Sequence, residues 1–400
     1  MVALGSFTTQ GSIVLAKRIL LLRDDDFFFY LHQLAVLLKS AGYDVHVVFT
    51  STKEIEPLYQ DLRDDVESRG IICDCIIDRS TRVTRTCRKI LFKLGLVRTR
   101  ALTRRKICNV GAVTKDHDYD SIIALGPAAL FLAWKAFPAQ RNRIIEYSLE
   151  VVEESHPAFH NDRELRFLVE HERKVLPHLR ALMIQDRFRE ALLLKQINSY
   201  DRRRTVYFPV TVSGPRVVPH REGSPKIVLF YGGLWSNDLR KQLRKAAKQL
   251  SSEYLVMIRG GRGADQVESC TDKNYILDKT PIPFSELDGL IATAHIGIAL
   301  YPNEDLNSRT TAFSSEKIAR YCKFGIPFIA FDNPDYRYLK TVHDCCMLIQ
   351  TYDELPEAIK NISERYEYYQ ENSWRAFDQF YCLENNCSDL LDLLSESRSA

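Results

Sequence analysis

Hydrophobic residues in this chain are grouped in short runs, and amphipathic segments with helical spacing lie between them. Most runs end at a polar residue or a glycine, as buried strands of a parallel sheet do. Strands that alternate with helices are typical of doubly wound α/β domains. The expected strands are residues 18–23, 44–50, 71–77, 121–125, 143–149, 179–185 and 206–210, followed by 226–231, 254–259, 275–278, 296–300 and 326–331.

These strands fall into two series, separated by a segment rich in proline, glycine, valine and serine. A chain of 400 residues suits two domains of ordinary size. We therefore predict an α/β protein with two Rossmann-like, doubly wound domains. The expected bounds are a flexible leader at 1–16, an N-terminal domain at 17–210, a linker at 211–225, a C-terminal domain at 226–372 and a C-terminal helix at 373–400.

Composition narrows the class of protein. The chain is 45% hydrophobic and 27% charged, and its net charge of +3 is too small to indicate a nucleic-acid partner. No apolar run approaches the roughly 20 residues of a membrane-spanning helix, and the N-terminus lacks a signal peptide. The ten cysteines contain no C-x-x-C pair. We therefore expect a cytoplasmic protein with reduced thiols and no metal site.

Residues 295–331 hold the most informative pattern in the chain. An apolar run ends at Tyr301 and a polar loop follows; Ser315 then opens an expected helix, which ends at Gly325 before a second apolar run. In such strand–helix–strand units ligands bind beyond the carboxyl ends of the strands, where helix N-termini point. Backbone N–H groups at the helix start, together with the Lys317 ammonium, suit a diphosphate.

This stretch resembles a known family. Ser315, Lys317, Tyr321, Gly325 and Pro327 match the Ser/Pro-x-Lys helix start, the tyrosine and the Gly-x-Pro of bacterial family-four (group 1) glycosyltransferases of the GT-B fold. The resemblance implies two domains facing a cleft, a C-terminal helix packed back on the N-terminal domain, and a nucleoside-diphosphate sugar as donor, with UDP the expected nucleotide. It implies a glycan or lipid-linked acceptor in surface polysaccharide synthesis, and neither metal nor cofactor. A βαβ unit of an unrelated α/β enzyme is the alternative.

The C-terminal half contains the donor-site candidates. Gly232 and Gly233 form a turn after an expected strand, where glycine lets the backbone approach a phosphate. Arg259 ends the next expected strand, and closing that strand is its alternative role. The expected nucleotide-sugar site consists of Gly232, Gly233, Arg259, Ser315, Glu316 and Lys317.

One motif of the resembled enzymes is missing. The positions of the Glu-x7-Glu pair in their retaining members hold Ala312 and Arg320 here. Glu316 is a candidate to bind the sugar or the ribose instead, and a role at the helix start is its alternative. The choice between retention and inversion therefore stays open. The missing pair also leaves open a second function, that of a glycosyltransferase-like protein that binds or scaffolds without catalysis.

A general base beside the acceptor hydroxyl is needed if the enzyme inverts. Glu150 follows the strand at 143–149, where the resembled enzymes carry an acidic motif, and is the first candidate catalytic residue. Asp26, in the turn after the first strand, is the second candidate, and Glu146 ranks below both. Helix capping is the alternative role for the aspartates of this turn.

The segment 79–106 is strongly basic, and no acidic residue occurs between positions 79 and 115. Apolar residues alternate with its cations, which is the pattern of a segment that binds an anionic membrane surface or a phosphate-bearing acceptor. A solvated helix pair is the alternative. We expect a peripheral position at the inner face of the membrane if the first interpretation holds.

Overall fold

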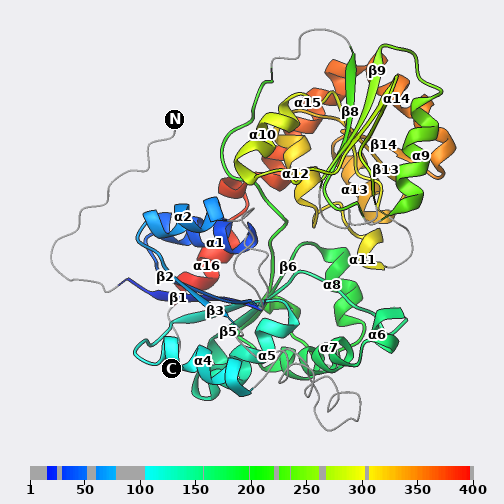
Figure 1. Ribbon diagram of the computed structural model, residues 1–400. Helices are drawn as coiled ribbons and strands as arrows, with labels where there is room; N and C mark the ends of the chain where they lie inside the picture. The colour runs from blue at the N-terminus through cyan, green and yellow to red at the C-terminus, as the bar shows by residue number, and fades with distance from the viewer. Residues whose placement is uncertain are drawn as a thin grey trace.

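Two α/β domains, one above the other in Figure 1, make up the described part of the chain. Each domain is built on a seven-stranded sheet with helices on both faces, as the sequence pattern predicts. The computed structural model describes residues 16–24, 29–51, 60–77, 104–155, 157–197, 199–219, 225–234, 236–260, 267–301 and 306–396.

The sheet of the N-terminal domain has the strand order β3-β2-β1-β4-β5-β6-β7, and all of its strand pairs are parallel. Its strands are β1 (Arg18–Arg23), β2 (Asp44–Ser51), β3 (Ile72–Ile77), β4 (Ser121–Leu125), β5 (Ile144–Ser148), β6 (Ala181–Ile184) and β7 (Thr205–Tyr207). Its helices are α1 (Phe29–Ser40), α2 (Gln60–Ser68), α4 (Arg104–Thr114), α5 (Pro127–Ala136), α6 (Pro157–Asn161), α7 (Arg163–Val175) and α8 (Arg187–Leu194).

Side chains of β1 alternate between the two faces of this sheet, because successive residues of a strand point to opposite sides. Ile19 and Leu21 belong to the hydrophobic core under α1 and α2. Leu20 and Leu22 belong to the core under α5 and α7. Both faces are therefore buried, which explains why the first strand reads as a continuous apolar run.

The sheet of the C-terminal domain has the order β10-β11-β9-β8-β12-β13-β14, and β10 is its antiparallel edge strand. Its strands are β8 (Lys226–Tyr231), β9 (Tyr254–Arg259), β10 (Cys270–Asp272), β11 (Tyr275–Asp278), β12 (Ile296–Ile298), β13 (Phe328–Phe331) and β14 (Cys346–Ile349). The helices are α9 (Asn237–Ala247), α10 (Phe284–Ala292), α11 (Leu306–Arg309), α12 (Glu316–Lys323), α13 (Pro334–Val342), α14 (Leu355–Glu364), α15 (Tyr366–Ala376) and α16 (Ser388–Ser395).

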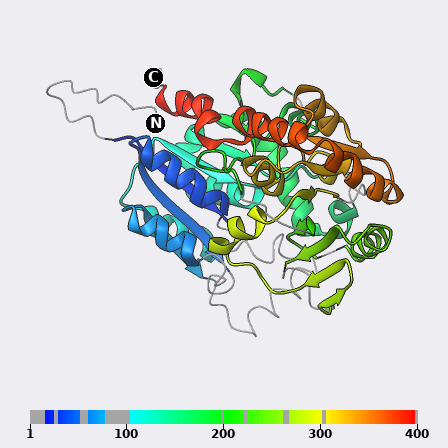
Figure 2. The same ribbon diagram turned by 90° about the horizontal axis from the view of Figure 1, so that it is seen from above.

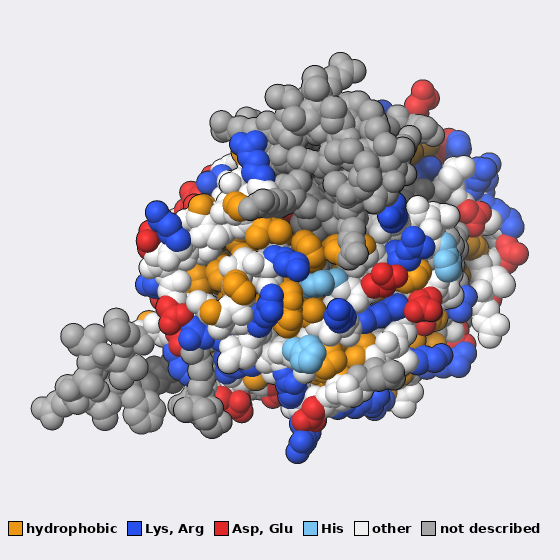
Figure 3. All heavy atoms as spheres, turned by 90° about the horizontal axis from the view of Figure 1, so that it is seen from below, with side chains coloured by type: hydrophobic (Ala, Val, Ile, Leu, Met, Phe, Trp, Pro, Cys, Tyr) orange, Lys and Arg blue, Asp and Glu red, His pale blue; other side chains and the backbone are white. Residues whose placement is uncertain are grey.

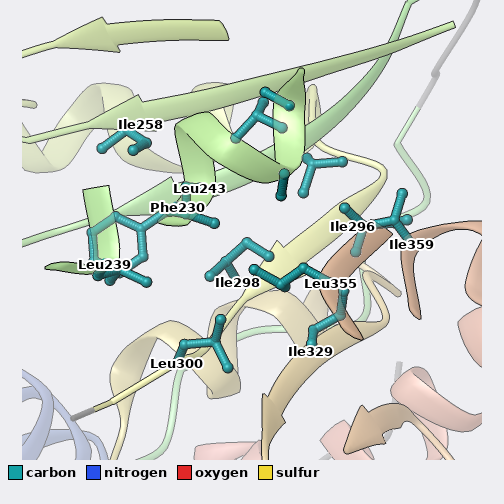
Figure 4. Close-up of a cluster of buried hydrophobic side chains, with 14 of the residues drawn as sticks. Phe230, Leu239, Leu243, Ile258, Ile296, Ile298, Leu300, Ile329, Leu355 and Ile359 are labelled. Atoms are coloured by element: carbon teal, nitrogen blue, oxygen red, sulfur yellow. The ribbon is translucent and has the colours of Figure 1, made fainter. Parts of the chain in front are cut away.

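One core of this domain fills the space between the sheet and the helices α9 and α14. Figure 4 shows Phe230, Ile258 and Ile298 of three strands pointing toward Leu243 of α9 and Leu355 of α14. Burying a side chain of this size contributes about 1.5–3 kcal/mol. The opposite face of the sheet is covered by α10, α12 and α13, so the start of α12 is held by a packed layer.

The C-terminal helices run across both domains, as the view from above shows (Figure 2). Trp374 of α15 packs so closely on Gly325 that a β-carbon there would lie 2.5 Å from the indole ring. Leu390 and Leu394 of α16 are buried in the core of the N-terminal domain. The Lys17 ammonium donates to the Ser395 carbonyl at 2.7 Å, so the first described residues and the last helix hold each other.

Most strands expected from the sequence are confirmed, several of them to the residue. The strands β10 and β14 and the helix α13 were not predicted. β10 is a three-residue strand with two polar residues, so the hydrophobic pattern carries little signal for it. β14 is apolar throughout, but a run of four residues is too short for its periodicity to separate a strand from a helix segment. The loop expected after Tyr301 is partly wrong, because residues 306–309 form the single turn α11.

Candidate active site

The start of α12 points toward the N-terminal domain and offers the free N–H groups of a helix N-terminus. Ser315 is its N-cap, and the hydroxyl accepts a hydrogen bond from the Ile318 backbone at 3.4 Å. Tyr301, at the end of the strand before it, is hydrogen bonded to the same hydroxyl at 2.5 Å. Ser315 therefore fixes where the helix begins, and Glu316 is its first residue.

Lys317 has an aromatic rather than an anionic environment. Its ammonium lies 3.8 Å from the ring centre of Phe230 and 5.2 Å from that of Tyr301. It makes no hydrogen bond or ion pair with any other residue that the structure describes. Burial lowers the pKa of Lys317 to about 7, although the nearby Glu316 carboxylate acts in the opposite direction. A cation held in this way is poised to gain from an anionic ligand.

The turn after β8 brings backbone close to this lysine. Gly232 has φ +120°, a conformation that other residues rarely adopt, and a β-carbon there would lie 3.9 Å from the Lys317 ammonium. A β-carbon on Gly260, in the next turn, would lie 1.9 Å from the Gly232 carbonyl oxygen. Gly233 continues the turn and is partly exposed. Backbone, helix start and ammonium therefore meet at one edge of the sheet.

Arg259 lies at the end of β9 and has a structural task. Its carbonyl accepts the Gly232 N–H at 3.0 Å, which joins the two turns. Its guanidinium forms an ion pair with Asp278 of β11 at 2.9 Å. The side chain is therefore already paired, and Arg259 contributes to this edge mainly through its backbone.

Glu316 and Arg320 explain what replaces the missing Glu pair. The Arg320 guanidinium donates to Glu316 at 2.5 Å and also binds Asp288 of α10, and its side chain is 3% exposed. Ala312 is buried, and its N–H donates to the Asp335 carboxylate at 2.8 Å. Both positions of the motif are thus occupied by residues with internal partners, and Glu316 is the carboxylate nearest the helix start.

Glu150 extends from the end of β5 toward the C-terminal domain and remains 65% exposed. Its carboxylate accepts a hydrogen bond from the Asn307 amide of α11. Tyr30 of α1 lies in the same region. Its pKa is raised well above the usual value by burial, by Tyr147, and by the carboxylates of Glu316 and Glu150. The carboxylates of Glu150 and Glu316 therefore both act on Tyr30.

Asp26, the second candidate base, lies outside the described residues. Its neighbour Asp24 is described, and its carboxylate accepts from the buried Lys106 ammonium at 2.7 Å and from Thr50. The basic segment 79–106 is described only from residue 104 onward. Lys106 at its end is buried in this ion pair, so it does not belong to a basic surface.

Glu146, ranked third as a base, is fully buried under α7. Its pKa is raised well above the usual value by burial and by the adjacent carboxyl of Glu172, whose own pKa burial also raises. A carboxyl enclosed in this way keeps its proton and cannot reach a substrate. The interpretation of Glu146 as a catalytic base is therefore wrong, for the physical reason that it lies inside the sheet–helix layer.

Two residues at this interface were not found by sequence reasoning. Arg189 of α8 and Asn307 of α11 lie between Glu150 and the start of α12. Neither belongs to a motif, and nothing in the sequence distinguishes Arg189 from the other arginines of the chain. Only the packing of two distant segments brings them together.

Other classes of site find no support in the described residues. They contain no group of three histidine, cysteine, aspartate or glutamate side chains arranged to hold a metal ion. No helix in these ranges has the length and apolar content needed to cross a membrane.

Two doubly wound domains, with a C-terminal helix that returns to the first domain, have the arrangement of the GT-B glycosyltransferase fold. The chain has this fold. Sucrose-phosphate synthase from Thermosynechococcus elongatus matches it with a TM-score of 0.66 and 14% identity, over 94% of this chain and 98% of that chain.

Two further solved structures match over most of this chain. The Anabaena protein HepE in complex with UDP-glucose matches with a TM-score of 0.62 and 12% identity, over 94% of this chain and 99% of that chain. The lipopolysaccharide outer core galactosyltransferase WaaB matches with a TM-score of 0.56 and 12% identity, over 94% and 99%. No protein-family model matches the chain, and no curated protein matches its sequence.

Proposed function

We propose that this protein is a glycosyltransferase that moves a sugar from a nucleoside-diphosphate sugar, with UDP the expected nucleotide, to a glycan or lipid-linked acceptor. The observation that carries the proposal is the Lys317 ammonium, which lies beside the Gly232 turn at the start of α12 and forms no ion pair with any described residue. The fold adds support, because HepE, which shares it, was solved with UDP-glucose.

The donor diphosphate would bind at the start of α12. There the N–H groups of Glu316 and Lys317 and the Lys317 ammonium offer positive charge to the leaving phosphate. Positive charge fixed before the reaction stabilises the charge that develops as the glycosidic bond breaks. The Glu316 side chain is 21% exposed, and one of its carboxylate oxygens is paired with Arg320. Its other oxygen is our candidate to accept a hydrogen bond from a hydroxyl of the ribose or the sugar.

The acceptor would approach from the N-terminal domain. Glu150 is our first candidate for the base that takes the proton of the acceptor hydroxyl, because it is exposed and extends toward the donor side. Asp26 is the second candidate. The acceptor is a glycan or a lipid-linked sugar in this proposal, and the protein acts in surface polysaccharide synthesis.

A binding protein without catalysis is the second candidate function. The observation that favours it is Arg320, which stands in the place of a glutamate of the resembled retaining enzymes and is tied to Glu316 and Asp288. The first function requires sugar transfer, whereas a binding or scaffold protein requires none. Release of UDP from UDP-sugars in the presence of glycan acceptors separates them.

Calorimetric titration with UDP, GDP, CMP and dTDP is the first test. We expect one nucleoside diphosphate to bind, and Lys317→Ala to weaken it about tenfold or more, because a hydrogen bond to a charged group contributes about 1.5–3 kcal/mol. Lys360→Ala, which removes an exposed lysine of α14, is the matched control. If no nucleotide binds, or if Lys317→Ala binds as the wild type does, the donor site is wrong.

An anionic surface remains our proposal for the basic segment 79–106. One face of the described N-terminal domain, seen from below in Figure 3, has hydrophobic side chains with lysine and arginine around them. Basic residues near an anionic leaflet contribute about 1 kcal/mol each. The protein should float with anionic liposomes at low salt and stay in solution with neutral ones. Failure to float would leave the segment as a solvated face.

A further inference from the structure

Arg189 is a buried arginine at the junction of the two domains. Its residue is 1% exposed, although it lies in the first turn of α8 in the N-terminal domain. Asp186 caps this helix and accepts the Arg189 N–H at 3.0 Å, which fixes the backbone from which the side chain extends. The capped first turn of α8 therefore fixes where the Arg189 guanidinium lies.

The guanidinium binds four groups on two segments of the chain. One nitrogen, Nη1, donates to the Thr310 carbonyl at 3.2 Å and to the Ser314 hydroxyl at 2.5 Å. The other, Nη2, donates to the Leu149 carbonyl at 2.8 Å and to the side-chain oxygen of Asn307. Leu149 belongs to the N-terminal domain, whereas the other three partners belong to the C-terminal domain. One side chain therefore holds the residues after β5 against the segment 307–314.

Asn307 extends this contact to the candidate base. Its amide group donates to the Glu150 carboxylate, and its oxygen accepts the Val151 N–H at 3.3 Å as well as Arg189. The Glu150 carboxylate lies 4.0 Å from the guanidinium, so Asn307 rather than Arg189 bonds to it directly. At the other end of the segment, Ser314 directly precedes the N-cap of α12.

A buried guanidinium is costly, and apolar side chains would hold two surfaces together as well. The guanidinium adds a constraint on geometry, because its planar fork of N–H donors requires several acceptors at fixed positions. Those acceptors come from both domains, so all of them are satisfied only in one relative arrangement. If the start of α12 moves when a diphosphate binds, Leu149 and Glu150 should therefore shift as well.

We infer that Arg189 is a positioning residue that couples the donor side of the site to the acceptor side: it transmits the position of the α12 start to Asn307 and Glu150. The inference rests on the proposed function, because it assumes that a nucleoside diphosphate binds at α12. Arg189 itself touches neither substrate in this arrangement.

Hydrogen exchange with and without saturating UDP tests the coupling. In the wild type, UDP should slow exchange of the Val151 amide and its neighbours, which lie in the other domain from the nucleotide. Arg189→Met should bind UDP within about threefold of the wild type yet lose this slowing. Its turnover should fall about 100-fold with the donor KM little changed, because small displacements of reacting groups cost that much. Lys195→Met, which removes an exposed lysine directly after α8, is the control and should behave as the wild type does.

Arg189→Lys keeps the charge but loses the fork, and it serves as the second variant if Arg189→Met does not fold. It too should bind UDP without slowing exchange at Val151. Slowing that persists in either folded variant, or a loss of UDP affinity that matches the loss of turnover, overturns the inference and leaves Arg189 a structural residue. If wild-type UDP binding is normal but Val151 does not respond, only the coupling fails. If the wild type binds no nucleotide, the proposed function fails as well.

Discussion

The ammonium nitrogen of Lys317 lies 3.9 Å from the point where a β-carbon on Gly232 would stand. Any side chain at position 232 would therefore reach into the space around the lysine. The ammonium also lies 3.8 Å from the ring centre of Phe230 and 5.2 Å from that of Tyr301. Burial among these groups lowers the pKa of Lys317 to about 7, which yields the first prediction.

Nucleotide affinity should fall as the pH rises above about 7, the pKa of Lys317 in the free protein. A diphosphate binds the charged lysine, so above this pH binding must be accompanied by proton uptake. The apparent Kd should then rise toward about tenfold per pH unit. Lys317→Arg keeps its charge throughout, and its affinity should be almost independent of pH between 7 and 9. Titrations of both proteins across this range make the comparison, and parallel profiles would contradict it.

The turn that carries Gly232 should not tolerate a side chain at Gly260. The φ of Gly260 is +151°, and holding any other residue in this conformation costs about 1–3 kcal/mol. The new β-carbon would also overlap the Gly232 carbonyl. We expect Gly260→Ala to lower the free energy of unfolding in urea by at least this amount and to weaken UDP binding. Gly289→Ala, in α10 with open space around it, should instead stabilise by about 0.5–1 kcal/mol.

Glu146→Gln should make the protein more stable at neutral and alkaline pH. The folded state keeps the Glu146 proton above the usual pKa of 4.5, so it binds more protons than the unfolded state. Stability of the wild type therefore falls as the pH rises through this window, by up to about 1.4 kcal/mol per pH unit. The variant lacks this loss. Urea unfolding at pH 5 and pH 8 measures it, with Glu170→Gln, on the exposed side of α7, as the control.

The rate of turnover should depend on Glu150, whereas the melting temperature of the protein should not. If Glu150 is the general base, Glu150→Gln lowers turnover about 10²–10⁴-fold while UDP affinity is kept. Its carboxylate is 65% exposed, so the melting temperature should change little. Asp26→Asn, measured in the same way, tests the second candidate. Full activity of both variants would exclude both residues and favour a retaining or substrate-assisted route.

Much of this protein was determined by its sequence alone. Strands such as Arg18–Arg23 and Lys226–Tyr231 are buried on both faces, so their apolar runs identify them without any tertiary information. The start of α12 could be read in the same way, because Ser315 caps a helix that begins directly after it. Patterns of this kind are local: the residues that produce them are neighbours in the chain.

Tertiary structure decided which polar groups meet. Lys106 looked like one more cation of a basic segment, and only the fold pairs it with Asp24, far away in the sequence. Glu146 lies within β5 and Glu150 follows its end, and only the fold shows that the first is fully buried while the second is exposed. Such pairings depend on contacts between distant segments, and no periodicity in the sequence records which segments pack together.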